Sequence, residues 1–253
     1  MSIDSAIIMA AGLGQRIPSY SRYCPKGFIE VGGVSLIERS LSLLREQGIE
    51  KVIIGTGHLS HFYEKLALKF KGLDITLVYN EVYAKTGSLE TFLRCCELVD
   101  GSFLSLESDL IYHTNILQHL LEMNKDNILI GSGRTYSGDE VYIGVDEYGY
   151  LNNLSKNLDD IDAIYAELVG ICRFDKHIAG NIQKVLKQRG VSRPCSWHYE
   201  EGLVAVSSNT NIKIEKVNFP WAEIDMLEHL QRVEKTVWPA ICELDVFENQ
   251  STR

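Results

Sequence analysis

The chain has 253 residues, of which 45% are hydrophobic and 23% charged, so it is long enough to bury a substantial core as one globular domain. Its 25 basic and 34 acidic residues give a formal net charge of −9, which disfavours a general binder of nucleic acid or of anionic membranes. Any polyanionic ligand would therefore have to be bound locally, with the help of a metal ion.

The cysteines and the first residues of the sequence suggest a cellular compartment for the protein. The six cysteines show no Cys-x-x-Cys spacing, so reduced thiols in a cytoplasmic protein are the simplest interpretation. The segment "MSIDS" carries an acid instead of a basic region, and no apolar run reaches the roughly 18 residues of a membrane span. We therefore expect a cytoplasmic protein with no signal peptide and no membrane span.

The first half of the chain alternates short apolar segments with amphipathic helical patterns, beginning with a strand: 6–11, 35–48, 51–57, 58–70, 75–80, 88–99 and 103–109. This βαβαβαβ order predicts an α/β fold with a Rossmann-like, mostly parallel sheet flanked by helices. Ligands in such sheets bind beyond the carboxyl ends of the strands. The loops that follow 6–11, 75–80 and 103–109 are therefore expected to form the site.

After about residue 127 the pattern changes to strand-like segments, and "EYGY" at 147–150 is typical of a hairpin turn between 139–145 and 151–156. We expect a β-rich lid built onto the sheet. Because the chain shows no internal repeat or Pro-rich linker, we predict a single domain, 1–253, with halves at 1–126 and 127–253.

The stretch "AIIMAAGLGQRI" runs from a strand into a glycine-containing turn and an arginine. A Rossmann fingerprint fails because Ile17 stands where the third glycine is required, and a Walker A loop fails because no Gly-Lys-Ser/Thr closes the turn. What remains is Gly-x-Gly-x-Arg, then Pro25-Lys26 ten residues after Arg16. This combination resembles the nucleotidyltransferases that activate phosphorylated small molecules. The alternative is a tight strand-to-helix turn with two surface cations.

The loop chemistry suits a nucleoside triphosphate. Glycines allow the main chain to approach the base and the phosphates closely. Arg16 can bind phosphate oxygens with its fork of donors, and Lys26 can place a compact charge near the reacting phosphorus. We expect Lys26 to have little core packing. The resemblance implies catalytic roles for these two cations and nucleotide contacts from the turn: Ala10, Ala11, Gly12 and Gly14.

Two acidic segments are candidates for a metal site. In "FLSLESD", Glu107 and Asp109 follow a core strand and share one face by alternation. In "NFPWAEIDMLEHL", Glu223 and Asp225 precede an apolar-periodic stretch. The resemblance implies that Asp109 and Asp225 hold Mg²⁺ against the triphosphate, with Glu107 supporting the ion through water.

Each acid also has a plainer explanation. Asp225 could be a helix N-cap, with Glu228 three residues later completing a capping box. Glu107 could be a solvated acid at the end of a strand.

The stretch "VYNEVYAKTGSLETF" matches the family segment that contacts the base and closes over the nucleotide. By that resemblance, Asn80, Thr86, Gly87 and Ser88 bind the nucleotide, and Glu107 assists. The sugar-activating branch carries Gly-Thr-Ala at this place, whereas Thr86-Gly87-Ser88 is more similar to the cytidylyltransferase branches.

Three segments of the second half resemble acceptor-binding positions. Lys156 aligns with a lysine that grips the acceptor's phosphoryl group, although it could equally be a surface lysine. Glu167 lies in an otherwise apolar strand, where the competing explanation is an acid at a sheet edge. The stretch "CSWHYEEGL" resembles the "Y-W-D-N-M" region of bacterial phosphocholine cytidylyltransferases. There Trp197, Tyr199 and Glu200 would surround a cationic group.

The same residues could be simple structural positions. Trp197 and Tyr199 could be core residues of a helix in the lid. His58, His61 and His198 show no arrangement of partners that suggests a ligand set, so we interpret them as structural.

Taken together, the resemblance implies a Mg²⁺-dependent cytidylyltransferase. CTP and 2-aminoethylphosphonate would give CMP-2-aminoethylphosphonate and pyrophosphate, for phosphonate lipid or glycan decoration. The carboxylates of Glu167, Glu200 and Glu201 outnumber the two aromatics, which favours a primary amine over a trimethylammonium group.

Several alternatives stay open. The acceptor could be phosphocholine or a sugar 1-phosphate, and outside the enzyme class the chain could be a silent nucleotide-binding regulatory domain. Phosphonate-type relatives can be fused to an aminotransferase, so a homodimer and fusion to or pairing with an aminotransferase are the expected protein partners.

Overall fold

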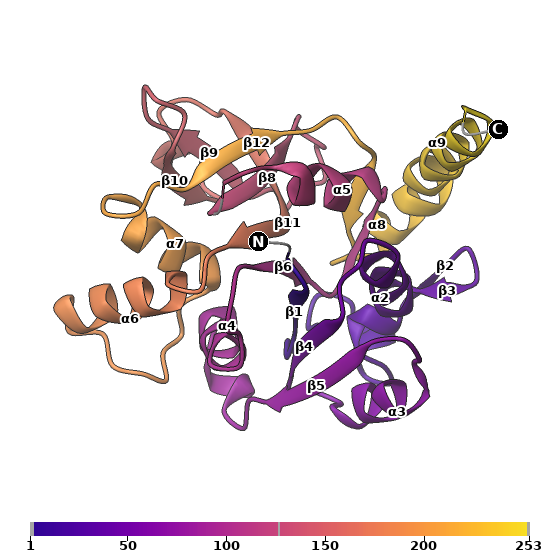
Figure 1. Cartoon of the computed structure of the whole chain (residues 1–253), viewed down its shortest axis with the longest axis horizontal. Coiled ribbons are helices and arrows are strands. Elements are labelled where there is room, and N and C mark those ends of the chain that lie inside the picture. Colours follow the sequence, from indigo (N-terminus) through magenta and orange to yellow (C-terminus); the bar gives the residue numbers. More distant parts are fainter. Residues whose placement is uncertain (1–2, 126, 252–253) are drawn as a thin grey trace.

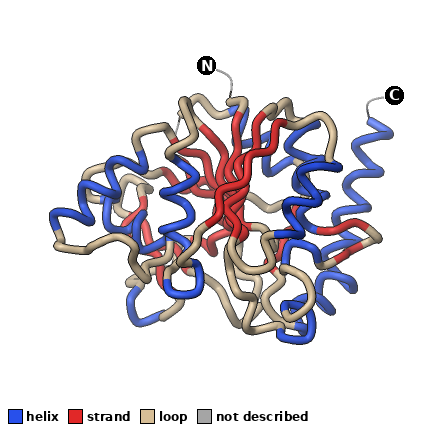
Figure 2. Tube along the Cα trace, turned by 90° about the horizontal axis from the view of Figure 1, so that it is seen from below, coloured by secondary structure: helices blue, strands red, loops and turns tan. Residues whose placement is uncertain are grey.

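The computed structural model describes residues 3–125 and 127–251, and a twisted sheet with helices on both sides forms its centre (Figures 1 and 2). Four strands of the first half lie parallel: β1 (Ser5–Ala10), β4 (Lys51–Thr56), β5 (Asp74–Tyr79) and β6 (Phe103–Glu107). Their order across the sheet is β6-β1-β4-β5. The predicted α/β fold with a mostly parallel sheet is confirmed.

Two apolar clusters cover the two faces of this sheet. Ile8 of β1 packs with α2 (Leu36–Glu46), α3 (His61–Lys69) and α5 (Asn115–Glu122). Ile7, the next residue, packs on the opposite face with α4 (Ser88–Cys96), α6 (Ile178–Gln188) and α7 (Tyr199–Ser207). Because both faces of β1 are buried, the segment "AIIMAA" is apolar throughout and does not alternate with polar residues.

The second half continues the same sheet. Its strands are β8 (Ile128–Ser132), β9 (Tyr142–Val145), β10 (Leu151–Ser155), β11 (Ala166–Phe174) and β12 (Lys213–Lys216). The long strand β11 runs antiparallel to β6 and also pairs with β8 and β9, so it joins the two halves. The predicted hairpin turn at 147–150 is confirmed between β9 and β10, with Gly149 at φ +78°.

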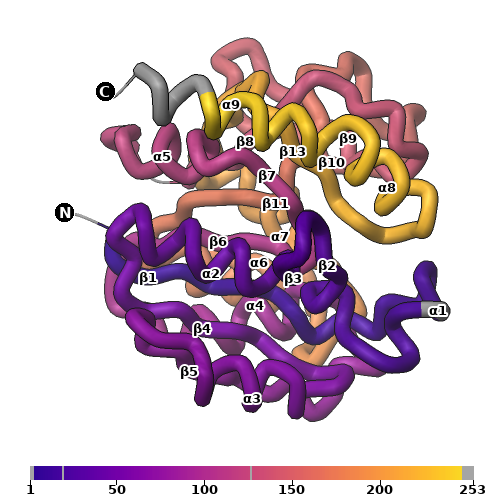
Figure 3. The backbone as a smooth tube through the Cα atoms, turned by 90° about the vertical axis from the view of Figure 1, so that its right-hand side faces the viewer, coloured from indigo at the N-terminus to yellow at the C-terminus, as the bar shows by residue number. Residues whose placement is uncertain are grey.

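A small second sheet brings the end of the chain back to the centre. The strand β13 (Trp221–Glu223) pairs antiparallel with β7 (Leu110–Tyr112), which follows β6 directly. After β13 come α8 (Leu227–Arg232), a π-helical turn at Val233–Val237 and α9 (Trp238–Ser251). Figure 3 shows α8 and α9 lying along one side of the molecule.

The remaining elements are short. They are α1 (Pro18–Ser21), the hairpin of β2 (Glu30–Val31) and β3 (Val34–Ser35), and 3₁₀ turns at Lys26–Phe28, Tyr83–Lys85 and Leu158–Asp160. All six cysteines are free thiols. Within the described residues, every helix is too short or too polar to cross a membrane.

Candidate active site

A cavity of about 760 Å³ opens beyond the carboxyl ends of β1 and β6 and is bordered by both halves of the chain. Most of the residues singled out from the sequence line it: Ala10, Ala11, Gly12, Arg16, Lys26, Thr86, Gly87, Ser88, Glu107, Asp109, Lys156, Glu167, Tyr199 and Glu200. Four others lie outside its lining: Gly14, Asn80, Trp197 and Asp225. The expectation that the loops after the parallel strands converge is therefore met.

The two glycines of the turn, Gly12 and Gly14, have different surroundings and different roles. A Cβ on Gly12 would meet no atom within 4 Å, so the backbone there is open to a ligand. Gly14 adopts φ +62°, and a Cβ there would lie 2.7 Å from the Cβ of Ser21. Gly14 therefore shapes the turn without lining the cavity, because only glycine tolerates both the left-handed conformation and the close contact.

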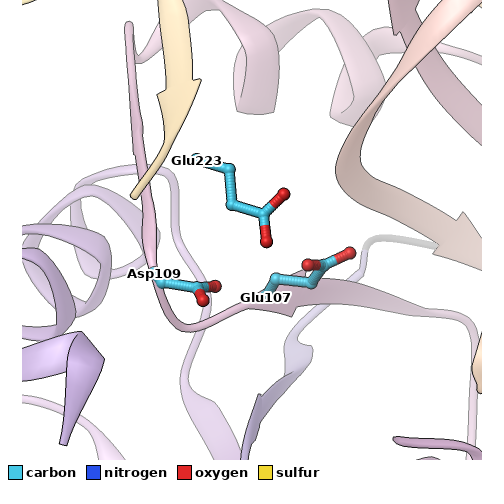
Figure 4. Close-up of side chains that lie close together, drawn as sticks. All are labelled: Glu107, Asp109 and Glu223. Atoms are coloured by element: carbon cyan, nitrogen blue, oxygen red, sulfur yellow. The ribbon is translucent and has the colours of Figure 1, made fainter. Parts of the chain in front are cut away.

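Carboxylates from distant segments gather at the cavity floor. Glu107 ends β6, Asp109 follows it, and the β7–β13 pairing aligns Glu223 with Leu110. Carboxylate oxygens of Glu107, Asp109 and Glu223 lie within 4.8 Å of one another, and Figure 4 shows these three side chains close together. Oxygens of Asp139, Glu223 and Asp225 form a second such group. Clustered oxygen donors are what Mg²⁺ requires, so the donor set fits this ion.

Two cations lie between these acids. Lys26 Nζ donates hydrogen bonds to Asp109 and Asp225, and Arg16 Nη2 donates to Asp225 Oδ2 at 2.6 Å. Arg16 also donates through Nη1 to Asp139. Burial alone would raise the pKa of the Asp225 carboxyl, but the charge of Lys26 holds that pKa below its usual range.

Asp225 is not a helix cap. The helix α8 begins at Leu227 with Met226 as its N-cap, while the Asp225 side chain is fully buried and points to the two cations. The backbone N–H of Asp225 donates to His229 Nδ1 at 3.2 Å, so His229 carries its proton on Nε2 and donates it to the carbonyl of Ser137 at 3.2 Å. His229 thus fixes the Asp225 backbone.

Glu107 is not a free acid at a strand end. Tyr199 Oη donates to Glu107 Oε1 at 2.6 Å. Burial, followed by the nearby charges of Glu200 and Asp109, raises the pKa of Glu107 to about 8. Gly170 adopts φ +80°, and a Cβ there would lie 2.9 Å from Glu107 Oε1, so glycine leaves room for this carboxylate.

The predicted base-binding segment is held in shape by Asn80. Its side-chain nitrogen donates to Thr86 Oγ1 at 3.2 Å and to Thr91 Oγ1 at 3.0 Å, and its oxygen accepts from Val82 N–H. Asn80 is 1% exposed, so it supports the segment from behind and does not line the cavity. Gly87 N–H donates to the Cys195 carbonyl, which fastens the segment to the chain before α7.

In the second half, Lys156 Nζ donates to Asp139 Oδ1 at 2.6 Å. Glu167 is 2% exposed, and β11 has partner strands on both sides, so the sheet-edge explanation is wrong. Both carboxylate oxygens of Glu167 accept from Thr135, from its N–H at 2.6 Å and its hydroxyl at 2.7 Å. Burial raises the pKa of Glu167.

The segment "CSWHYEEGL" is only partly turned toward the cavity. Trp197 packs against the apolar cluster formed with α4, α6 and α7, so the expectation that its ring surrounds an acceptor needs correction. Glu201 accepts from the His198 N–H at 2.7 Å and caps α7. Glu200 lines the cavity, and its Oε2 is buried without a hydrogen-bond partner among the described residues. Burial raises its pKa.

A family model built on known proteins matches more than half of the chain. Residues 6–160 match the MobA-like NTP transferase domain. The chain belongs to this family. The matched range includes Arg16, Lys26 and Asp109 and ends before Glu223 and Asp225.

Two relatives are informative. The choline-phosphate cytidylyltransferase of Haemophilus influenzae is 32% identical over 112 residues, which are 44% of this chain and 46% of that protein. The chain thus spans about half the length of that relative. The 2-aminoethylphosphonate cytidylyltransferase of Lancefieldella rimae is 26% identical over 194 residues, 74% of each chain.

Among solved structures, the inositol-1-phosphate CTP transferase from T. maritima superposes with a TM-score of 0.80, at 20% identity and 96% coverage of both chains. The fold is therefore shared with that structure over nearly the whole of both chains.

Sequence reasoning missed several cavity residues. Asp139, Tyr63 and Arg232 line the cavity outside every site motif quoted above, and His229 lies within "NFPWAEIDMLEHL" but was not singled out there. Glu223 had a signal, because it precedes Asp225 by two residues in the same acidic segment.

Proposed function

We propose that this chain is a Mg²⁺-dependent cytidylyltransferase that transfers CMP from CTP to 2-aminoethylphosphonate and releases pyrophosphate. The observation that carries the proposal is that Arg16 and Lys26 meet four carboxylates lining one cavity at the carboxyl ends of the strands, Glu107, Asp109, Asp139 and Glu223, and are backed by the fully buried Asp225. A silent nucleotide-binding domain would have no need of buried acids and cations held against one another.

Asp109 and Asp225 are the proposed ligands of Mg²⁺; they belong to two neighbouring carboxylate groups, Asp109 with Glu107 and Glu223, and Asp225 with Asp139 and the same Glu223. When bound, the ion supplies positive charge next to the triphosphate. Lys26 lies between the same two aspartates and balances part of their negative charge.

The proposed reaction requires that the two substrates be held in line and that the negative charge on the phosphate oxygens be neutralised. An oxygen of the acceptor's phosphonate attacks the α-phosphorus of CTP in line, the bond to the bridging oxygen breaks, and pyrophosphate leaves with its electron pair. Arg16 and Lys26 neutralise charge on the equatorial oxygens and on the leaving group. No covalent intermediate with the enzyme is needed.

A primary ammonium group fits Glu200. Of the three acids expected to face the acceptor's amine, Glu167 accepts from Thr135 at both oxygens and Glu201 caps α7, whereas Glu200 has a buried oxygen in the cavity with no hydrogen-bond partner among the described residues. A trimethylammonium group has no donor for that oxygen and needs several aromatic faces, one of which, Trp197, lies outside the cavity.

Pyrophosphate release tests the proposal. The purified protein is incubated with CTP, Mg²⁺ and one of 2-aminoethylphosphonate, phosphocholine or a sugar 1-phosphate. We expect the amine to give at least about tenfold higher kcat/KM than phosphocholine, equivalent to about 1.4 kcal/mol, the contribution of one charge-assisted hydrogen bond. A preference for phosphocholine would refute the acceptor assignment. The absence of pyrophosphate release with every acceptor would refute the proposed enzymatic activity.

The free thiols and the use of CTP favour a cytoplasmic setting. Homodimer formation and pairing with an aminotransferase stay predictions.

A further inference from the structure

One carboxylate joins Arg16, which the proposed function assigns to the nucleotide, with Lys156, which the resemblance noted from the sequence assigns to the acceptor. Asp139 accepts from Arg16 Nη1, on the nucleotide loop, and from Lys156 Nζ, after β10. Its side chain is 13% exposed, whereas those of Arg16 and Lys156 are about half exposed. The two flexible cations are therefore held by a more rigid acid between them.

The loop that carries Asp139 is fastened from several sides. Thr135 donates twice to Glu167, and its carbonyl accepts from Arg232 at 3.3 Å. The Ser137 carbonyl accepts from His229. Gly138 then turns the chain with φ +89° and donates to Glu140 Oε2 at 3.1 Å. These contacts fix the backbone on both sides of Asp139, so its carboxylate does not have to be ordered when substrates bind.

Both terminal nitrogens of Arg16 donate to carboxylates. Nη2 is bound to Asp225, which is fully buried and also held by Lys26, and Nη1 is bound to Asp139. These two contacts leave three N–H donors of Arg16 for phosphate, but the two carboxylates offset its positive charge, so a triphosphate that binds Arg16 competes with them for that charge. Asp139 is the more exposed partner and keeps Lys156 when Arg16 leaves it.

We propose that Asp139 is a positioning residue that competes with the triphosphate for Arg16 and holds Lys156 in place for the acceptor's phosphoryl group. This inference rests on the proposed function. It implies opposite effects on the two substrates. The carboxylate weakens nucleotide binding by occupying Arg16 and by its own charge, and it strengthens acceptor use by orienting a half-exposed lysine.

The test is Asp139→Asn, which keeps the size of the side chain and removes its charge. We expect the KM for CTP to fall about threefold and kcat/KM for the acceptor to fall about fivefold, the range of partly exposed ion pairs. The matched control is Asp162→Asn, which removes the same charge from an exposed position before β11 and should change neither constant by more than about 1.5-fold.

A double-variant cycle with Lys156→Gln separates positioning from general damage. If Asp139 acts on the acceptor through Lys156, the double variant should be no worse for acceptor kcat/KM than Lys156→Gln alone. A merely structural role would instead lower the melting temperature and worsen both substrates together. Multiplicative losses in the cycle, or a raised KM for CTP in Asp139→Asn, would overturn the inference.

Calorimetric titration with inorganic tripolyphosphate provides a readout without turnover. We expect Asp139→Asn to bind tripolyphosphate about threefold more tightly than the wild type does, and Asp162→Asn to match the wild type. If the wild type releases no pyrophosphate with any acceptor, the proposed function fails while this titration still tests the competition for Arg16. If the wild type is active and Asp139→Asn behaves as Asp162→Asn does, only the inference about Asp139 fails.

Discussion

The ammonium group of Lys26 lies between the carboxylates of Asp109 and Asp225, and of these three side chains Asp225 is fully buried. The expectation that this lysine has little packing therefore needs revision. Its neighbours raise its pKa further above the ordinary value, against the effect of burial, so it stays charged.

Replacing Lys26 should affect both folding and turnover. In Lys26→Met two buried carboxylates lose this cation and Asp225 keeps only Arg16, so we expect about 3 kcal/mol less stability in EDTA, together with at least about a hundredfold lower kcat. Because a divalent cation can replace the lost charge, Mg²⁺ should restore part of the melting temperature. Lys176→Met, at an exposed turn, is the control for both assays. An unchanged melting temperature in EDTA would show that the ion pairs contribute nothing.

Asp109→Asn and Asp225→Asn should each raise the Mg²⁺ concentration needed for half-maximal rate. Because both residues are proposed to act through one ion, we expect the double variant to be scarcely worse than the worse single variant. Titrating Mg²⁺ against pyrophosphate release measures this, with exposed Asp100→Asn as the control. If the two substitutions lowered the rate independently of each other, Asp225 would act only by fixing Arg16 and Lys26. Activity that persisted in excess EDTA would refute the proposed dependence on a metal ion.

Glu200→Gln should reduce the preference for the primary amine. We expect the KM for 2-aminoethylphosphonate to rise about tenfold while the KM for CTP stays constant, since only the amine contacts Glu200. Glu147→Gln, in the exposed β9–β10 turn, removes the same charge away from the cavity and should leave both constants alone. A variant that kept the full amine preference would remove Glu200 from the acceptor site.

The same acid predicts a pH effect on acceptor binding. Burial raises the pKa of Glu200, so this carboxyl takes up its proton at a higher pH than an ordinary glutamate does and then no longer attracts an ammonium group. In the wild type, the KM for the amine should rise as the pH falls, with its inflection above the ordinary value of 4.5. In Glu200→Gln that inflection should be absent. An identical profile in the two proteins would assign the titration to another group.

Glu167 predicts a pH effect on stability. Because burial raises its pKa in the folded protein, the folded state holds the proton more tightly than the unfolded chain does. The stabilisation is complete below the ordinary value of 4.5 and is lost as the pH rises through the higher folded pKa. Urea unfolding should therefore show the stability of Glu167→Gln rising relative to wild type across that window. A constant difference would contradict the raised pKa.

The first half of the fold was predictable because each of its elements carries its own signal. Buried parallel strands read as short apolar runs, and the helices between them show a clear apolar face, so segments such as 51–57 and 88–99 contain the observed elements. The same reasoning placed Glu107 and Asp109 at the edge of the sheet where the cavity lies, because ligand clefts of parallel sheets open at the carboxyl ends of the strands.

What could not be predicted depends on contacts between distant segments. Trp197 looked like a wall of the acceptor site, but the helix α7 starts two residues later and leaves its ring in the apolar cluster. Asp139 lies in an irregular loop, and nothing in the residues around it indicates that Arg16, more than a hundred positions earlier, is its partner.

The pairing of β13 with β7 determines at which point of synthesis the site can be completed. On the ribosome, the glycine turn, Lys26 and Asp109 emerge long before Glu223 and Asp225, which reach Asp109 only when β13 adds to β7. A nascent chain can thus form the parallel sheet and its nucleotide loop while Glu223 and Asp225 are still unsynthesised. The proposed competence to hold a metal-bound triphosphate therefore requires synthesis to pass Asp225, and a chain released before that residue would lack two of the acids.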